Sequence, residues 1–319
     1  MMKADMSQQA LTYSIIANPS ARSGGSSAAM RKALEQALAK HGISYDLYWT
    51  TGKGNAMELA REISAQLKDT VLVVLGGDGT INEVLNGIQD FSRVRLGFLP
   101  AGSSNDLARG LKLHDIDTLI QRICAGSVIR TIDLGILHYD HLPKMKDRIF
   151  AISCGIGYDA AICEEALHSR IKKFFNLLHQ GKLSYGVIGA KQLFAAPSSH
   201  CEITLKDGTG YSADRMLFAS VMNTPYEGGG YQFAPDALPD DSLLNLVMVG
   251  DIAKLNALIH FPSAHEGRYY HVKGVTHSMA ERIHIETSTP LWVHTDGEVI
   301  TKADSVSVSI LPHRLNLIV

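Results

Sequence analysis

Strand-like and helix-like segments alternate along the first third of the sequence, and this alternation restricts the fold more than any other feature. Apolar segments typical of buried strands lie at residues 12–17, 44–50, 70–77 and 94–100. Segments with helical patterns lie at residues 26–42, 55–69, 80–88 and 104–111. In the first of these, Met30, Leu34 and Leu38 recur at four-residue spacing, and Gly42 is the expected C-cap. Asn55 is the expected N-cap of the second. Such alternation predicts a parallel sheet with helices on both faces.

The pattern changes after about residue 136, where short apolar segments are separated by turn residues. These segments predict a mainly β domain of the sandwich type, interrupted by helical patterns near residues 158–196 and 251–266. A chain of 319 residues also suits two domains better than one core. We therefore expect an α/β domain at residues 1–136 and a β-sandwich domain at residues 137–308. The apolar segment at about 309–319 is expected to return to the first domain.

Charge and cysteine content exclude several functional classes. A net charge of −2 gives no general reason to expect nucleic acid binding, and no strong attraction to an anionic membrane. The four cysteines are far apart in the sequence, which argues against a disulfide framework or a cysteine metal site. The sequence shows no signal peptide and no run of 18 apolar residues. We expect a cytoplasmic protein without a transmembrane segment.

Three loops rich in glycine, serine and asparagine follow predicted strands, at residues 18–25, 76–82 and 100–106. The carboxyl ends of parallel strands share one edge of a sheet, and ligands bind there. Glycine lets the backbone approach a ligand closely, and the helix that begins near Thr80 offers N–H groups to a phosphate. Asp78 would either hold Mg²⁺ that bridges phosphates or orient its loop. Each loop alone fits a plain turn, but three at one edge favour a nucleotide.

Seven motifs extend the pattern to nearly the whole chain. In order they are "NPSARSGG", "GGDGTINEVLNG", "PAGSSNDLARGL", "TIDLG", "GIGYDA", "MNTPYEGGGYQFAPDALPDDSLLNLVMV" and "VHTDGE". Together they resemble the diacylglycerol kinase catalytic family, which includes bacterial lipid kinases, sphingosine kinases and ceramide kinases. Ser103 stands where that family usually has threonine. The resemblance implies a Rossmann-like nucleotide domain and a β-sandwich domain, with the active site in the cleft between them.

The resemblance also implies a reaction, in which the γ-phosphate of ATP passes to a lipid hydroxyl with the help of Mg²⁺. It places ATP on Asn18, Pro19, Thr51, Gly76, Gly77, Asp78, Gly79, Thr80, Asn82, Ser103 and Asn105. The acidic residues that it assigns to Mg²⁺ are Asp78, Asp106 and Asp133. The expected proton acceptor is Glu298, with Asp296 as a supporting or metal-linked residue, although the two roles could be exchanged. On its own, "DGE" is more typical of a hairpin turn.

Two further sites follow from the resemblance. Leu238 and Leu243 would bind a structural Mg²⁺ through backbone carbonyls, and Asp241 through its carboxylate. Ser242 replaces the usual glycine there, at a strain of about 1 kcal/mol if φ is positive, and the alternative is a plain β-turn. Asp159 matches a residue that meets the lipid head in sphingosine-kinase-like members. Its alternative role is the N-cap of a helix at residues 160–167.

The lipid and the manner of membrane contact stay open at this point. A helical segment at residues 170–194 combines Lys172, Lys173, Phe174, Phe175 and Leu177. It would either contact the inner membrane face peripherally or pack on the sandwich with a basic edge. Diacylglycerol-like and sphingoid-like acceptors are equally compatible, and a homodimer is neither predicted nor excluded. The alternatives are an NAD kinase or phosphofructokinase-like enzyme, and a catalytically silent relative that binds lipid or nucleotide.

Overall fold

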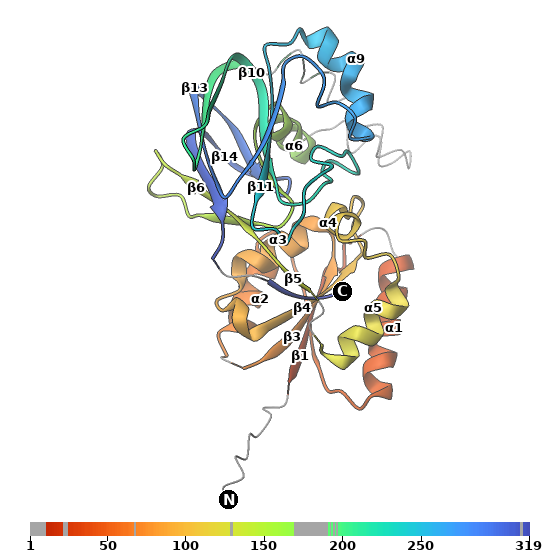
Figure 1. The fold of residues 1–319 in the computed structure, drawn as a ribbon. Helices are drawn as coiled ribbons and strands as arrows, with labels where there is room; N and C mark the ends of the chain where they lie inside the picture. Colours follow the sequence, from red (N-terminus) through yellow and green to blue (C-terminus); the bar gives the residue numbers. More distant parts are fainter. Residues whose placement is uncertain are drawn as a thin grey trace, which may run out of the picture. The chain divides into compact units, whose positions relative to one another are not determined.

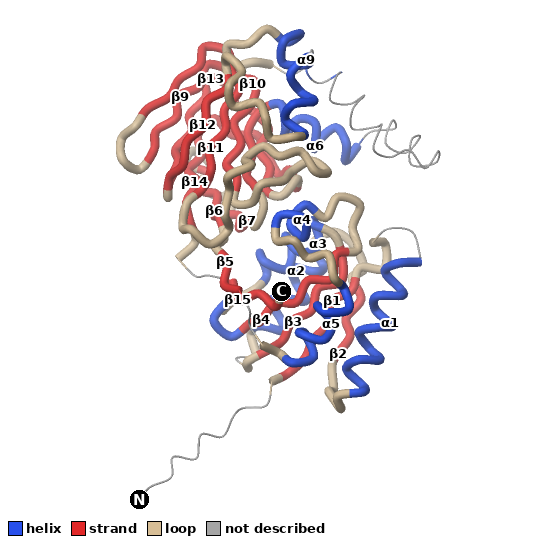
Figure 2. Tube along the Cα trace, turned by 45° about the vertical axis from the view of Figure 1, so that its right-hand side comes forward, coloured by secondary structure: helices blue, strands red, loops and turns tan. Residues whose placement is uncertain are grey.

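The protein divides into two compact units, which Figures 1 and 2 show as a ribbon and a tube. The computed structural model describes residues 11–21, 25–66, 68–127, 130–168, 191, 193, 195, 197–312 and 315–319. The N-terminal unit comprises Met1–Ile132 and His313–Val319, and the C-terminal unit comprises Asp133–Pro312. The division follows Ile132, a few residues before the expected position, because strand β6 at Gly135–Tyr139 already pairs within the second sheet.

The N-terminal unit contains a six-stranded sheet in the order β2-β1-β3-β4-β15-β5. All neighbours pair in parallel except β15 and β5, which are antiparallel. The strands are β1 Thr12–Ala17, β2 Asp46–Trp49, β3 Thr70–Gly76, β4 Val94–Pro100, β5 Arg130–Ile132 and β15 Leu315–Ile318. The helices are α1 Gly25–Lys40, α2 Asn55–Ser64, α3 Asp78–Gly87, α4 Asp106–Gly110, α5 Ile116–Ala125 and the 3₁₀ helix η1 Phe91–Arg93. The C-terminal strand β15 thus lies in the first sheet, between β4 and β5.

Helices cover both faces of this sheet, as the alternating pattern predicts (Figure 1). Leu34 and Leu38 of α1 are fully buried against Ile15 and Val73 of the sheet, together with residues of α5. Met30 packs against the same core. Every residue of β3 is buried, which is why its sequence is continuously apolar rather than alternating.

The helix ends agree only partly with the sequence prediction. Gly42 has φ 68° just beyond the end of α1, as a C-terminal glycine should. The predicted N-cap at Asn55 is wrong, since the N-cap is Gly54 with φ 85° and Asn55 is already helical. Glu83 of α3 supplies the missing acceptor, because its carboxylate accepts the N–H groups of Gly54 and Ala56 at 2.7 and 3.1 Å. A side chain from a distant helix has replaced the local cap.

The C-terminal unit is β-rich, with one antiparallel sheet of nine strands. The order is β12-β11-β10-β8-β13-β14-β6-β7, and β9 also pairs with β10 and β13. The strands are β6 Gly135–Tyr139, β7 Arg148–Phe150, β8 Ser153–Gly157, β9 Ser199–Leu205, β10 Gly210–Met222, β11 Leu244–Gly250, β12 Val275–Ala280, β13 Arg282–Thr295 and β14 Glu298–Ile310. The described helices are α6 Tyr158–His168 and α9 Lys254–His265.

Strands β8 and β9 share the space between the long strands β10 and β13, because each pairs with a different part of both. The apolar segments at residues 282–288 and 291–295 belong to one strand. Residues 282–295 form the single strand β13, with an irregularity between Glu286 and Leu291. All nine strands contribute buried side chains to one core.

None of the described helices has both the length and the apolar character that crossing a membrane requires. The expected membrane-contacting segment at residues 170–194 lies almost entirely outside the described residues.

Candidate functional site

The three loops that were predicted to hold a nucleotide lie together in the N-terminal unit. Asn18, after β1, donates from Nδ2 to Oγ1 of Thr80 in α3 at 3.1 Å. The N–H of Ala101, after β4, donates to the carbonyl of Gly76 at 2.7 Å. The carboxyl ends of β1, β3 and β4 are therefore connected directly, beside the N-terminus of α3. The positive end of a helix dipole at such a point favours a phosphate.

The glycines of these loops allow the loops to touch each other. A Cβ on Gly77 would lie 2.9 Å from Cα of Gly102, and a Cβ on Gly102 would lie 2.5 Å from Cα of Gly77. A Cβ on Gly76 would lie 2.7 Å from Cβ of Thr80. Gly77 has φ −100°, a value that any residue adopts, so its backbone conformation does not require glycine. The close approach of the two backbones explains Gly77 and Gly102 instead, and the Thr80 side chain explains Gly76.

Asp78 orients the loops. Its Oδ2 accepts the N–H of Asp106 at 3.0 Å, and its Oδ1 accepts the N–H of Leu107 at 3.3 Å. The carboxylate therefore caps α4 and connects the loop after β3 to the loop after β4. A carboxylate oxygen that accepts a backbone N–H can also be a ligand of a hard cation. Asp106 is buried and faces Arg109, whose Nε lies 3.7 Å from Oδ1.

The remaining predicted ATP residues differ in exposure. Asn105 has φ 52° and closes its loop through two bonds with the backbone of Gly102. Ser103, Pro19 and Thr51 are exposed. Asn82, by contrast, is fully buried and its backbone carbonyl accepts from Asn86. Its side chain therefore supports α3 from inside and is not presented at the surface.

The "DGE" motif in the C-terminal unit is a β-hairpin turn. Asp296 and Gly297 have φ values of 50° and 81°, and Thr295 of β13 pairs with Glu298 of β14. Two positive φ values are typical of the two-residue turns that Asp-Gly favours. Asp296 and Glu298 therefore do not follow one another along a single strand. Glu298 is the first residue of β14 and is half-buried.

Asp296 is occupied by backbone groups. Its carboxylate accepts the N–H groups of Ala151, Ile152 and Ser153 at 3.1, 2.8 and 3.1 Å. Its own N–H donates to the carbonyl of Ser153 at 2.9 Å. These bonds attach the turn to the segment between β7 and β8. They favour a supporting role for Asp296 and leave Glu298 as the candidate proton acceptor.

Asp133 holds the loop that was predicted to bind a structural metal. It is 1% exposed, and its Oδ2 accepts the N–H of Ser242 at 2.7 Å. Its N–H donates to the carbonyl of Pro239 at 2.6 Å. Asn223, which sequence reasoning missed, is fully buried and donates from Nδ2 to the carbonyls of Asp133 and Ala151, both at 2.9 Å. Asn223 thus connects Asp133 to the segment that Asp296 contacts.

The loop that was predicted to bind a structural metal forms a turn at Ser242. Ser242 adopts φ 64°, the positive value that the usual glycine would take. Oδ1 of Asp241 accepts the N–H of Leu243 at 2.9 Å, and Leu238 is exposed. One carboxylate and two backbone carbonyls are hard oxygen donors, which suit Mg²⁺. The residues present therefore fit the predicted ion.

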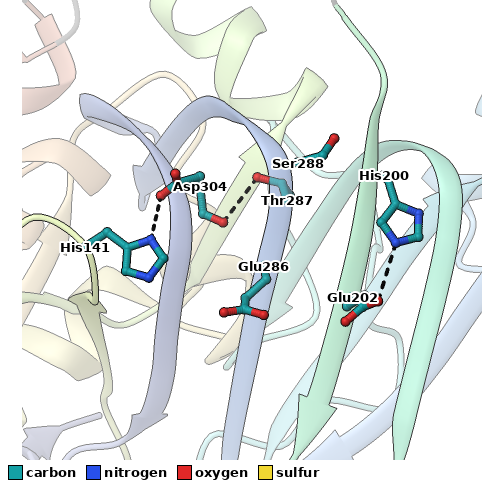
Figure 3. A pocket seen from close by; sticks show the side chains of 7 residues that line it. All are labelled: His141, His200, Glu202, Glu286, Thr287, Ser288 and Asp304. Carbon is teal, nitrogen blue, oxygen red and sulfur yellow. Dashed lines mark hydrogen bonds and ion pairs between the residues drawn. The ribbon is translucent and has the colours of Figure 1, made fainter.

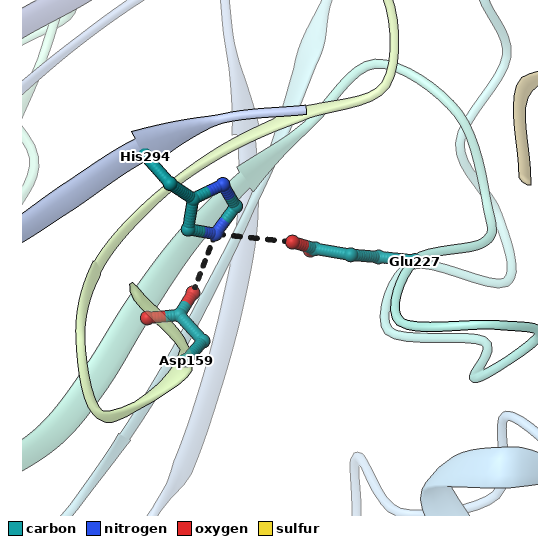
Figure 4. Close-up of side chains that lie close together, drawn as sticks. All are labelled: Asp159, Glu227 and His294. Carbon is teal, nitrogen blue, oxygen red and sulfur yellow. Dashed lines mark hydrogen bonds and ion pairs between the residues drawn. The ribbon is translucent and has the colours of Figure 1, made fainter. Parts of the chain in front are cut away.

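A buried cluster of three titratable residues lies beside the "DGE" turn (Figure 4). Nε2 of His294 lies 3.1 Å from Oε1 of Glu227 and 3.3 Å from Oδ2 of Asp159. The His294 side chain is fully buried, and 15% of Asp159 and 13% of Glu227 are exposed. Asp159 lies in the first turn of α6 as its second residue, so it is not the N-cap. Sequence reasoning named Asp159 but missed Glu227 and His294.

Burial and mutual attraction shift these groups in different directions. Burial raises the pKa of Asp159, against the hydrogen bond from His294. Burial also acts to raise the pKa of Glu227, but the charge of His294 and hydrogen bonds from His294 and Ser220 lower it overall. Burial acts to lower the pKa of His294, but the charge of Glu227 and the hydrogen bonds that His294 donates to both carboxylates outweigh burial and raise this pKa overall.

A surface hollow of about 260 Å³ lies elsewhere on the same unit (Figure 3). It is lined by His141, His200, Glu202, Glu286, Thr287, Ser288 and Asp304. Two of its histidines pair with carboxylates, His141 with Asp304 at 3.1 Å and His200 with Glu202 at 3.5 Å. None of the residues predicted from the sequence lines this hollow.

Comparison with known proteins matches both units. Residues 12–137 match the family model described as "Diacylglycerol kinase catalytic domain", and residues 152–319 match "YegS C-terminal NAD kinase beta sandwich-like domain". The chain is 32% identical to YtlR of Bacillus subtilis strain 168, which carries a provisional lipid-kinase name, over 84% of this chain and 87% of that one. It is 30% identical to a diacylglycerol kinase of Staphylococcus saprophyticus, over 82% and 80%.

A solved structure from Bacillus anthracis, provisionally named a diacylglycerol kinase, has the same fold, with a TM-score of 0.72 at 23% identity over 96% of both chains. The sequence matches and the fold of each unit agree with each other and with the seven motifs. The chain belongs to the diacylglycerol kinase family, with a catalytic domain followed by a β-sandwich-like domain.

Proposed function

We propose that this protein is an ATP-dependent lipid kinase, which transfers the γ-phosphate to a diacylglycerol-like or sphingoid-like hydroxyl. The observation that carries the proposal is the convergence of three loops at the carboxyl edge of the parallel sheet, where Gly77 and Gly102 are in backbone contact. Family membership supports a phosphotransferase, and the names of its relatives support a lipid acceptor.

In the N-terminal unit, the loops after β1, β3 and β4 would surround the phosphates of ATP. Asp78 would hold Mg²⁺ through its carboxylate, and Asp106, whose N–H donates to that carboxylate, lies beside it in space. Mg²⁺ supplies neutralisation of the phosphate charge. Because Asp78 also joins two loops, it would place the ion and the loops as one unit.

In the C-terminal unit, Glu298 would accept the proton of the lipid hydroxyl as the hydroxyl oxygen attacks the γ-phosphorus. The bond from this phosphorus to the β–γ bridging oxygen would break, and ADP would leave. An alcohol is a weak nucleophile, so a carboxylate within hydrogen-bond reach is the expected base. The three bonds that Asp296 accepts from residues 151–153 would hold the turn that carries Glu298. Asp159 would meet the polar head of the lipid through its exposed edge.

A phosphoryl-transfer assay tests the acceptor. Purified protein is incubated with labelled ATP and Mg²⁺, and with lipid alcohols in mixed micelles, NAD or fructose 6-phosphate. We expect label in a lipid alone. Label in NAD or in the sugar phosphate would show the related kinase activities instead. Nucleotide binding without label in any acceptor would indicate a silent relative.

Substituting Glu298 tests the proton acceptor. Glu298→Gln should lower turnover by about 10²- to 10⁴-fold, because it removes the base and keeps the shape. ATP binding, followed by fluorescence of a labelled analogue, should stay unchanged. Glu202→Gln is the matched control, since Glu202 is an exposed carboxylate on β9 of the same unit. Near-normal turnover of Glu298→Gln would remove Glu298 from this role.

We also propose that helix α9 contacts the bilayer in which the lipid acceptor resides. Leu255, Leu258 and Ile259 are 61%, 40% and 63% exposed, and their spacing places them on one face of the helix. The helix is anchored from its other side, where Tyr231 packs against Phe261 with ring centroids 4.6 Å apart. Lys254 in the first turn adds a positive charge beside this apolar face. Exposed apolar side chains next to a positive charge favour an anionic bilayer surface.

Sedimentation with anionic phospholipid vesicles tests this contact. The double variant Leu255→Gln/Ile259→Gln should bind vesicles several-fold more weakly than the wild-type protein, because two apolar side chains no longer enter the interface. Met279→Gln is the control, as Met279 is 53% exposed but lies on β12. Equal binding by the double variant and the wild type would rule out α9 as the contact surface.

A further inference from the structure

The cluster of Asp159, Glu227 and His294 joins three distant segments of the C-terminal unit at the "DGE" turn (Figure 4). Asp159 comes from α6, and His294 from the end of β13. Glu227 lies in a tight loop closed by two backbone hydrogen bonds with Tyr231. The intervening glycines 228–230 all have positive φ, between 66° and 111°. The loop is therefore compact, and it places the Glu227 carboxylate next to the imidazole of His294.

The second imidazole nitrogen of His294 contacts the turn itself. The backbone N–H of Gly297 donates to Nδ1 of His294 at 3.2 Å. Gly297 lies between Asp296 and the candidate base Glu298, so this bond acts directly on the turn. His294 thus has carboxylates on its Nε2 side and the backbone of the turn on its Nδ1 side.

These contacts determine which nitrogen carries the proton. Nδ1 accepts a hydrogen bond from an amide, so it must be bare. Nε2 faces two carboxylates, so it must be the donor. The raised pKa of His294 would favour a second proton on the ring, but that proton would meet the Gly297 amide. The ring therefore keeps a single proton, on Nε2, which faces both Asp159 and Glu227.

The same contact argues against a metal ion. The three ligand atoms lie within 4.8 Å of one another, and two carboxylates with one imidazole could bind a divalent cation. A neutral histidine that binds a metal through Nε2 carries its proton on Nδ1. That proton would face the N–H of Gly297, and two donors repel. The cluster suits a shared proton.

Strand β8 closes one side of the cluster. A Cβ on Gly155 of β8 would lie 2.0 Å from Oδ2 of Asp159 and 2.4 Å from Nε2 of His294. The glycine lets the strand lie directly against the cluster. The imidazole therefore cannot swing away from the turn on this side without moving β8.

We propose that His294 is a positioning residue for the transfer reaction, which holds the Asp296–Gly297–Glu298 turn through its bare Nδ1, and that the Asp159–Glu227–His294 cluster contains a shared proton in place of a metal ion. The part that concerns the reaction rests on the proposed role of Glu298. The tautomer and the absence of metal affinity do not depend on that role.

The first experiment is ¹⁵N NMR of the wild-type protein with labelled histidine, with the imidazole of His294 assigned by through-bond correlation to its own backbone. We expect an imidazole with a bare Nδ1 and a protonated Nε2, unchanged when one equivalent of Zn²⁺ is added. A protonated Nδ1, or a shift of this signal with bound Zn²⁺, would overturn the proposal, whether or not the protein is a kinase.

The second experiment compares two amide variants. His294→Asn places an oxygen near Nδ1, so it can still accept from Gly297 but cannot reach the carboxylates. His294→Gln places an amide near Nε2, so it can bind the carboxylates but offers nothing to Gly297. We expect His294→Gln to lower kcat at least tenfold more than His294→Asn, with KM for ATP unchanged in both.

The outcomes separate this proposal from the proposed function. Equal kcat values for the two variants, or a lower kcat for His294→Asn, would show that the bond to Gly297 does not matter. A protein that phosphorylates no lipid but shows the expected tautomer would contradict the proposed function alone. Variants that fail to fold leave the NMR measurement on the wild type as the deciding test.

Discussion

The loops of the N-terminal unit and the buried cluster of the C-terminal unit are built in opposite ways. The loops use small residues and backbone contacts at the edge of a sheet, and several of their side chains are exposed. The cluster consists of three ionisable side chains, of which His294 is completely buried. A loop of this kind is formed by neighbouring residues and is specified locally. A cluster of this kind exists only when distant segments have been packed together.

The largest effect should come from filling the space beside the cluster. Gly155→Ala would place a methyl group 2.0 Å from Oδ2 of Asp159 and should lower the free energy of unfolding by about 3 kcal/mol. Gly210→Ala, in β10 of the same sheet, is the matched control, since the nearest atom to its Cβ would be 3.9 Å away. Urea unfolding of both variants makes the comparison. Equal unfolding free energies for Gly155→Ala and Gly210→Ala would show that the cluster rearranges to admit the methyl group, which a tightly packed core would not do.

A smaller effect should come from the loops. In Asp78→Asn one of the two carboxylate oxygens becomes an NH₂ group, which would face a backbone N–H of α4. We expect a loss of about 1–2 kcal/mol in unfolding free energy, together with weaker ATP binding. Asp115→Asn is the control, because its second oxygen faces the hydroxyl of Thr118, which can turn to accept. A loss of stability in Asp115→Asn equal to that in Asp78→Asn would contradict this account of the loops.

The smallest effect should be a pH dependence that only the cluster shows. The hydrogen bonds that Glu227 accepts from His294 and Ser220 lower its pKa on folding, so its contribution to stability is present above the ordinary value of 4.5 and is lost as the pH falls through the lowered value. The wild type should exceed Glu227→Gln by about 1 kcal/mol near neutral pH, and the difference should vanish once the pH has fallen below the lowered pKa of Glu227. Thermal unfolding over this pH range provides the check, and a difference that grows on acidification would contradict it.

Much of the N-terminal unit could be predicted because its signals are local. The spacing of Met30, Leu34 and Leu38 identified the buried face of α1, and the apolar run of β3 identified a central strand. The cap of α2 could not be predicted, since Glu83 acts from another helix. Ser242 shows the converse, because the turn forced a positive φ on a residue that disfavours it. Its N–H bond to the buried Asp133 helps to hold that conformation.

The sequence by itself determined the order of elements, the presence of three loops at one sheet edge, and the family, because each depends on short runs of neighbouring residues. Only the tertiary structure decided how the acidic residues are used. It showed Asp78 capping α4, Asp296 accepting three backbone amides, and His294 meeting the turn and two carboxylates. An aspartate, glutamate or histidine looks the same in the sequence whatever its role. That role depends on the donors and acceptors that folding brings within about 3 Å of its side chain.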